Sequence, residues 1–203
     1  MATLKTLTAA AGAAAALTVA PAAQAEPETF TIDQTHSNIV FMLNHLGYAN
    51  MIGQFQDYSG EFTFDPEDPS AASVSLTIQA DSIDTDHAKR DQHLAGPDFL
   101  NAAEFPTITF ESTGVEKTGE TTGTLTGDLT MHGETHPVTL DVTFNKMAPN
   151  PLPQYDDILT AGFSARGTIE RSKWGVDAYV PAVGDEMRLL IEIEGQDKDA
   201  QQE

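Results

Sequence analysis

The sequence contains no cysteine in its 203 residues. Disulfide bonds, thiol nucleophiles and cysteine-ligated metal sites are therefore excluded, and the stability of the fold must come from its core. Positive charge is scarce too, because ten Lys and Arg stand against 31 Asp and Glu, for a formal net charge of −21. A surface of this sign repels phosphate backbones, so we expect no nucleic-acid partner.

Catalytic motifs are also missing. The chain has no Gly-x-Ser-x-Gly elbow, no His-Glu-x-x-His and no glycine-rich phosphate loop. Acidic residues are so abundant that some carboxylates lie close together by chance, and no pair stands out as a glycosidase pair. The sequence therefore predicts a protein that is not an enzyme and has no catalytic cofactor.

Long hydrophobic runs are confined to the first residues. A single Lys5 precedes the run Leu7–Ala20, and Ala23-Gln24-Ala25 fits the small-x-small cleavage rule. We expect residues 1–25 to be a secretory signal peptide, cleaved after Ala25, which predicts a periplasmic protein. Residues 26–203 have the size of one domain. Cleavage would remove Lys5 and change the formal net charge from −21 for the whole chain to −22 for residues 26–203. No later apolar run is long enough for stable membrane insertion.

The remaining chain alternates apolar and polar residues as half-buried strands do. In "PVTLDVTFN", residues 137–145, every second residue is apolar. Similar segments predict about eight strands, near 29–45 (with a possible break at Gln34), 51–64, 72–80, 107–115, 121–131, 135–146, 158–171 and 186–195. We expect an all-β fold with an antiparallel sheet, either a closed barrel or a two-sheet sandwich. Glycines within the strands favour the barrel, which at this strand number either fills with side chains or holds one small ligand.

One segment between the third and fourth predicted strands is not strand-like. Asp84 or Thr85 can cap a helix over residues 88–94, and Gly96-Pro97 ends it. Such a helix would cover one mouth of the barrel.

Histidines are the remaining candidates for chemistry. His132, Glu134 and His136 have metal-ligand spacing, but they straddle Gly133 in a predicted hairpin and have no fourth ligand nearby, so we predict turn residues and no metal site. In the first strand, alternate residues from Ser37 to His45 share one face. His45 is therefore either a hydrogen-bonded core histidine or a polar marker beside an apolar tunnel.

Four stretches together resemble one known family. They are "HSNIVFMLNHLGYANMIGQFQDYSGEFTFD", "RDQHLAGPDFLNAAEFPTITFEST", "GDLTMHGETHPVTLDVTFN" and "GFSARGTIERSKWGVD". Taken in this order over nearly the whole mature chain, they are similar to the YceI-like family, periplasmic lipocalin-like proteins that bind polyisoprenoid chains.

The resemblance implies an eight-stranded antiparallel lipocalin-like barrel with one short helix, often a homodimer, around a cavity for an isoprenoid lipid such as a polyprenyl lipid or an isoprenoid quinone. Strand parity and the resemblance together predict the ligand-binding residues Ile39, Phe41, Leu43, His45, Phe62, Leu76, Ile78, His93, Phe110, Leu140, Val142 and Phe144. One departure concerns the polar headgroup. Where the family has a His-Leu-Arg-Ser-like run, this chain has His93-Leu94-Ala95-Gly96, which leaves Arg90 or Arg166 as substitutes for the arginine.

Three hypotheses follow. The first is a non-enzymatic periplasmic carrier for an isoprenoid lipid. The second is an enzyme that acts on an apolar isoprenoid-like substrate and depends on His45 or His93. The third is a filled barrel that acts by protein contact in a stress response.

Overall fold

The computed structural model describes residues 27–155 and 157–198, which form strands with one α-helix and a few short 3₁₀ turns. The strands are β1 (Glu28–Ile32), β2 (Asn38–His45), β3 (Ala49–Phe55), β4 (Tyr58–Phe64), β5 (Ser73–Gln79), β6 (Ile83–Asp84), β7 (Thr107–Lys117), β8 (Thr122–Met131), β9 (Glu134–Pro149), β10 (Leu159–Glu170) and β11 (Val183–Asp197). The helix α1 spans Ala88–Leu94.

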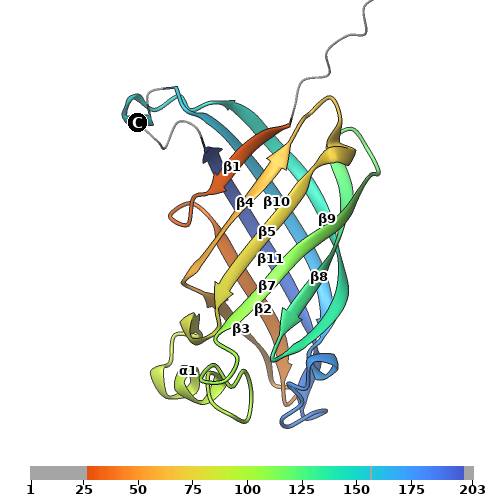
Figure 1. Cartoon of the computed structure of the whole chain (residues 1–203). Helices are drawn as coiled ribbons and strands as arrows, with labels where there is room; N and C mark the ends of the chain where they lie inside the picture. Colours follow the sequence, from red (N-terminus) through yellow and green to blue (C-terminus); the bar gives the residue numbers. More distant parts are fainter. Residues whose placement is uncertain (1–26, 156, 199–203) are drawn as a thin grey trace, which may run out of the picture.

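These strands build a closed antiparallel barrel with eight wall positions (Figure 1). Three positions are each shared by two successive strands, β1 with β2, β3 with β4, and β5 with β6. The order around the wall then follows the chain, and β11 closes the ring by pairing with both β1 and β2. The predicted fold class, an eight-stranded antiparallel barrel with one helix, is confirmed.

The helix lies at one end of the barrel, together with the β2–β3 and β8–β9 hairpins (Figure 1). We call this the α1 end. The β4–β5, β7–β8 and β9–β10 connections lie at the opposite end, near the end of β11. Within the described residues, no helix has both the length and the hydropathy needed to cross a membrane.

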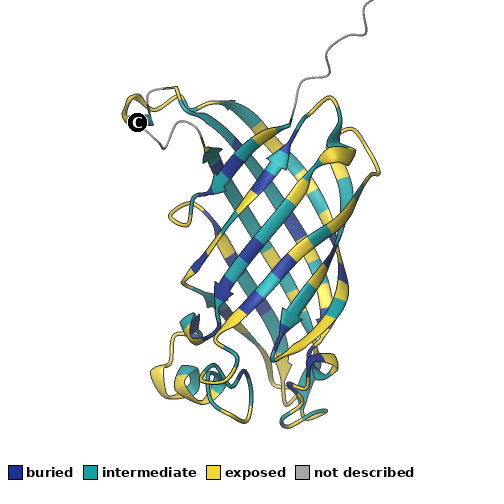
Figure 2. Ribbon diagram, in the orientation of Figure 1, coloured by how far each residue is buried: buried dark blue, intermediate teal, exposed yellow. Residues whose placement is uncertain are grey.

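Burial alternates along the strands, as their sequences predict (Figure 2). In β9, Val138 and Leu140 are buried and Val142 and Phe144 half-buried, while the threonines between them are exposed. Because successive side chains of a strand point to opposite faces, these four residues face the interior of the barrel. The apolar face of "PVTLDVTFN" therefore points into the barrel.

An aromatic cluster packs inside the barrel toward the opposite end. The ring of Phe64 lies 4.9 Å from that of Phe163 and 5.0 Å from that of Phe144, measured between centroids, and Phe30 stacks on Phe62 at 5.0 Å. Offset and edge-to-face pairs at such distances stabilise the fold beyond the contribution of burying the rings. Four of these rings, Phe62, Phe64, Phe144 and Phe163, also line the interior cavity.

Two local predictions were wrong. The predicted strand 51–64 is divided, because the wall bends between β3 and β4 and the two halves pair with different neighbours, β6 and β1. The helix cap is neither Asp84 nor Thr85 but His87, whose Nδ1 accepts a hydrogen bond from the backbone N–H of Arg90 at 3.3 Å. Thr85 is not free to cap because its N–H and hydroxyl both donate to Asp91.

Candidate ligand-binding cavity

The barrel encloses a cavity of about 660 Å³ that runs from the α1 end to the opposite end. All eight wall positions contribute to its lining, which consists mostly of aliphatic and phenylalanine side chains. Polar residues reach it mainly at its ends: His45, Thr85, Arg90, His93, Arg171 and Tyr179 at the α1 end, and Lys117, Glu120, Thr121 and Thr122 at the other. Between them lies an apolar tube.

The structure places all twelve predicted ligand-binding residues on the wall of this cavity. Their role in binding stays a prediction. The two candidate arginines differ, because Arg90 lines the cavity whereas Arg166 is exposed on the outside of β10. Arg166 as a substitute for the family's headgroup arginine is therefore wrong, since its position in the strand points it away from the interior.

Glycines explain why phenylalanines line the wall without filling the tube. Gly53 pairs directly with Phe41 across β2 and β3, and a Cβ added to Gly53 would stand 2.2 Å from the Cζ of Phe41. In the same way, a Cβ on Gly127 would stand 2.3 Å from the Cζ of Phe110. Each ring therefore occupies the space that a neighbouring side chain would take. The rings lie along the wall and leave the axis of the barrel open.

Arg90 supplies a fixed positive charge at the α1 end. Its Nε donates to the hydroxyl of Thr85 at 2.7 Å and its Nη2 to the Thr85 carbonyl at 2.6 Å, while the Thr85 hydroxyl donates to Asp91. Arg90 and Asp91 both belong to α1, so the helix is tied to the chain segment that precedes it. The guanidinium has five N–H donors, and those that do not bind Thr85 remain for an anionic or polar group.

The two predicted histidines lie at this same end. His45 ends β2, and His93, in α1, contacts the Asp98 carboxylate through Nε2 at 3.1 Å and packs edge-on against Phe99. The ring of Phe99 lies in turn 6.1 Å from that of Tyr179. The α1 end of the cavity therefore combines aromatic surface with nitrogen donors.

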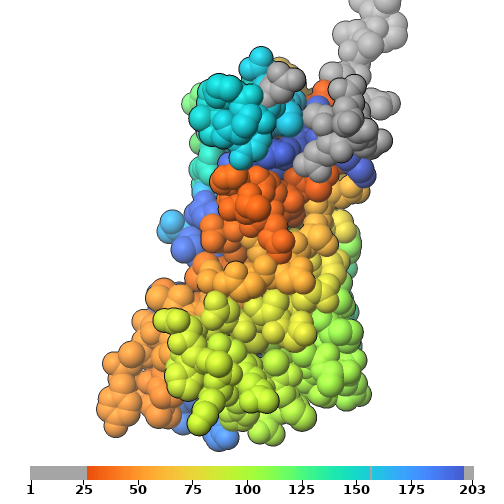
Figure 3. All heavy atoms as spheres, turned by 90° about the vertical axis from the view of Figure 1, so that its left-hand side faces the viewer, coloured from red at the N-terminus to blue at the C-terminus, as the bar shows by residue number. Residues whose placement is uncertain are grey.

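The β2–β3 hairpin projects from the α1 end (Figure 3), and several exposed side chains at this end are apolar. Tyr48 is 88 % exposed, and Leu46, Ile52 and Tyr179 are also exposed. No Asp, Glu, Lys or Arg occurs between residues 38 and 56. The hairpin thus offers an uncharged, partly apolar surface next to this mouth of the cavity.

A buried arginine holds the loop between β10 and β11. Arg171, 4 % exposed, donates to the backbone carbonyls of Gly184, Val176, Ala178 and Val183 at 2.6 to 3.1 Å. Burial lowers the pKa of Arg171, although nearby Asp185 opposes this shift. Burial in turn raises the pKa of Asp185, but hydrogen bonds from Ser172 and the charge of Arg171 outweigh it and hold the pKa below its ordinary value. This arginine is a structural anchor at the edge of the cavity.

The histidines of the β8–β9 hairpin serve the fold. Nδ1 of His132 lies 3.1 Å from the carbonyl oxygen of Trp174, and the ring of His136 packs edge-on against that indole. Within the described residues, His132, Glu134 and His136 do not bring their ligand atoms close enough together to share one metal ion.

Sequence reasoning missed part of the cavity. Alternate residues of β11, from Met187 to Ile193, line it, as do Phe163, Ala165 and Ile169 of β10. Their alternation was visible in the sequence and could have identified them. The approach of Thr85 and Tyr179 to the α1 end had no such signal, because both lie in connections between strands.

Comparison with known proteins now identifies the family. A family model for the YceI-like domain matches residues 30–195. The chain belongs to the YceI-like family. A "UPF0312 protein" of Yersinia pestis is 38 % identical over 160 residues, which cover 79 % of this chain and 81 % of that protein.

Solved structures agree with the family assignment. The YceI protein of Campylobacter jejuni has a TM-score of 0.68 and 33 % identity over 76 % of this chain and 90 % of its own. A polyisoprenoid binding domain from Saccharophagus degradans has a TM-score of 0.63, covering 83 % of this chain and 98 % of its own. Its identity is only 11 %, so it shows that the two proteins share a fold.

Proposed function

We propose that this YceI-like protein is a periplasmic carrier that holds an isoprenoid lipid, the tail of a polyprenyl lipid or of a quinone, inside its barrel and catalyses no reaction on it. The observation that carries the proposal is the apolar tube of about 660 Å³. The name of the Saccharophagus domain, which is a polyisoprenoid binding domain, supports the ligand class. The N-terminal segment, which lies outside the described residues, supports the location through its signal-peptide pattern.

The energetics favour a long apolar ligand. Removing apolar surface from water is worth about 0.8 kcal/mol per CH₂ group, so roughly ten buried groups match the ~8 kcal/mol of a micromolar complex before the cost of ordering the chain. An isoprenoid tail offers only methyl, methylene and alkene surface, and thus leaves no polar group unpaired in the tube. Such binding requires a dry wall and no reactive side chains.

The shape of the barrel suits an extended tail. The longest antiparallel pair, β10 with β11, runs the height of the wall. A strand of 15 residues such as β11 extends about 50 Å, and a tilt of ~40° leaves a barrel about 38 Å tall. Because the polar nitrogens of Arg90, His45 and His93 gather at the α1 end, we propose that the headgroup of the ligand lies there and its tail points to the phenylalanine cluster.

The cavity also bears on the two other hypotheses. A barrel whose interior is filled by its own side chains is inconsistent with a tube of this volume. An enzyme needs a reactive group beside the substrate, and the titratable groups that line the tube stand at its ends. Replacing His45 or His93 by alanine is therefore expected to alter headgroup preference and to leave tail binding in place.

The test is to purify the mature protein from periplasm, extract it with solvent and identify any released lipid by mass spectrometry. The delipidated protein is then offered a polyprenyl phosphate, an isoprenoid quinone and a straight-chain fatty acid of equal carbon number. We expect uptake of both isoprenoids at one molecule per barrel. Failure to bind any of them, with the barrel folded, would refute the proposal.

A further inference from the structure

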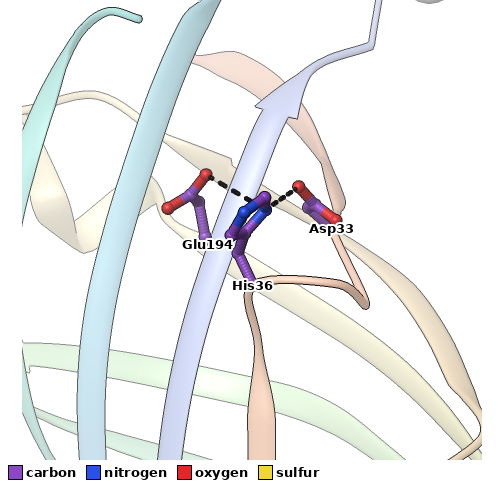
Figure 4. Close-up of side chains that lie close together, drawn as sticks. All are labelled: Asp33, His36 and Glu194. Atoms are coloured by element: carbon purple, nitrogen blue, oxygen red, sulfur yellow. Dashed lines mark hydrogen bonds and ion pairs between the residues drawn. The ribbon is translucent and has the colours of Figure 1, made fainter. Parts of the chain in front are cut away.

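Three potential metal ligands from distant parts of the sequence meet on the outside of the barrel (Figure 4). Asp33 follows β1, His36 precedes β2 and Glu194 belongs to β11. Nδ1 of His36 lies 2.7 Å from Oδ2 of Asp33 and 4.0 Å from Oε1 of Glu194. One ligand atom from each residue falls within 4.8 Å of the other two.

The cluster lies at the seam where the barrel closes. β11 pairs with β1 up to the pair Ile32–Gly195 and with β2 from the pair Asn38–Glu192. Between these pairs the chain leaves the wall and returns, and the three ligands stand at this interruption. A group that joins them would tie both ends of the gap to β11.

Backbone hydrogen bonds fix the positions from which the three side chains extend. The N–H of Asp33 donates to the carbonyl of Glu194 at 2.8 Å, and the N–H of Glu194 donates to the hydroxyl of Ser37 at 3.0 Å. Oδ1 of Asp33 accepts from the N–H and the hydroxyl of Thr35, so Oδ2 faces the imidazole. The ligands thus come from segments that are already held together.

A second cavity beside the cluster provides room for further ligands. It has a volume of about 350 Å³, and its lining includes His36 and Glu194 together with Glu192, Asn145 and Asn150. Side chains of His36 and Glu194 are 48 % and 33 % exposed, so each is free to rotate by the small amount that chelation requires. Water and side-chain oxygens are available here to complete a coordination shell.

We propose that Asp33, His36 and Glu194 form a binding site for a divalent first-row transition metal ion at the seam of the barrel. One imidazole nitrogen and two carboxylate oxygens form a ligand set that Zn²⁺, Co²⁺, Ni²⁺ and Mn²⁺ accept, with water in the open positions. The ion replaces the proton between Nδ1 of His36 and Oδ2 of Asp33. The acidic surface of the chain attracts cations to the site.

Two consequences follow from this geometry. The site links β1, β2 and β11 only in the folded chain, so binding raises the thermal midpoint in proportion to the logarithm of metal concentration. Binding also weakens as pH falls, because protons compete for the imidazole. Neither consequence depends on a ligand in the apolar tube.

The experiment is a calorimetric titration of the mature, chelator-treated protein with ZnCl₂, repeated with MnCl₂ and NiCl₂ in a non-coordinating buffer. We expect one saturable site per chain, with affinity at least tenfold lower in His36→Ala and in the near-isosteric Glu194→Gln. Glu170→Gln is the matched control for Glu194→Gln, because Glu170 forms an exposed ion pair with Lys173, 56 % exposed for Glu170, does not line the apolar tube and belongs to no group of three ligands among the described residues. It should bind as the wild type does.

Thermal unfolding with and without ZnCl₂ gives the second readout. The midpoint of the wild type and of Glu170→Gln should rise with metal, and that of His36→Ala and Glu194→Gln should not. Two results overturn the proposal: a wild type that binds none of the three ions in a 1:1 complex, or a Glu194→Gln variant that binds and is stabilised as the wild type is. The latter would mean that the metal binds elsewhere.

Discussion

Replacing Gly53 by alanine tests how the tube is kept open. The new Cβ would stand 2.2 Å from Cζ and 2.8 Å from Cε1 of Phe41, and 2.8 Å from Cγ2 of Thr85. Carbon atoms in contact lie about 3.5 to 4.0 Å apart, so the edge of the ring must move by more than about 1 Å. Gly53 and Phe41 face the tube, and the ring therefore swings toward its axis.

We expect this variant to lose about 1–3 kcal/mol in the free energy of unfolding, the usual cost of overpacking. Isoprenoid uptake should fall as well, because the displaced ring narrows the tube. Urea unfolding measures the first effect, and displacement of a bound fluorescent isoprenoid analogue by an unlabelled isoprenoid measures the second. Gly114→Ala is the control, since a Cβ there meets no atom within 4 Å.

A compensating change separates the ring from other causes. Phe41→Leu removes the atoms that clash, so the double variant Gly53→Ala/Phe41→Leu should recover uptake relative to Gly53→Ala alone. Wild-type uptake by Gly53→Ala, in a protein as stable as the Gly114→Ala control, would refute the argument that glycine holds the ring against the wall.

Other changes probe other parts of the molecule. Leu140→Asp puts a carboxylate into the apolar tube and should abolish isoprenoid uptake, whereas its outward neighbour Thr139→Asp should bind normally in the same displacement assay. For the seam, hydrogen bonding to Asp33 raises the pKa of His36 above 6.5, so its contribution to stability is present below that pH and is lost as pH rises through the raised value. Burial raises the pKa of Asp33, but hydrogen bonds from Thr35 and His36 outweigh it and leave the pKa below 3.8, so that contribution is lost only as pH falls through the lowered value. The stability gap between wild type and Asp33→Asn should therefore be widest between about pH 4 and 6.5, measured by urea unfolding in a metal-free buffer, and a gap independent of pH would contradict it. Arg171→Met leaves four carbonyls without their donor and should lower the free energy of unfolding by at least about 3 kcal/mol in the same unfolding assay; a loss below 1 kcal/mol would show that the loop does not need this anchor.

Much of the wall was readable from the sequence, because strand parity is a local property. The alternation around Leu140 fixes which side chains face inward once one face is known to be buried. The predicted break at Gln34 is confirmed, since β1 ends at Ile32 and β2 begins at Asn38. Parity alone did not place Arg166. Its outward direction became clear only once the structure showed which face of β10 lines the cavity.

Contacts between distant segments were not readable. Asp33 and Glu194 are brought together only by closure of the barrel, and no sequence pattern in either segment predicts that the two lie close together. The cap of α1 was mispredicted for a different, local reason, because the side chain of Thr85 is already hydrogen-bonded to Asp91 in the helix. Whether the interior is hollow or filled also depends on glycines such as Gly53 lying opposite a ring on the next strand, which requires the register of both strands.

The central claim is that the barrel carries an isoprenoid lipid. Its most direct test is native mass spectrometry of the mature protein purified from periplasm, with the mass of any bound species measured after gentle release and identified by fragmentation. The account predicts one polyprenyl or quinone molecule per barrel, lost in Leu140→Asp and kept in Thr139→Asp. A wild-type protein that carries no lipid, and that takes up no added isoprenoid, would contradict it.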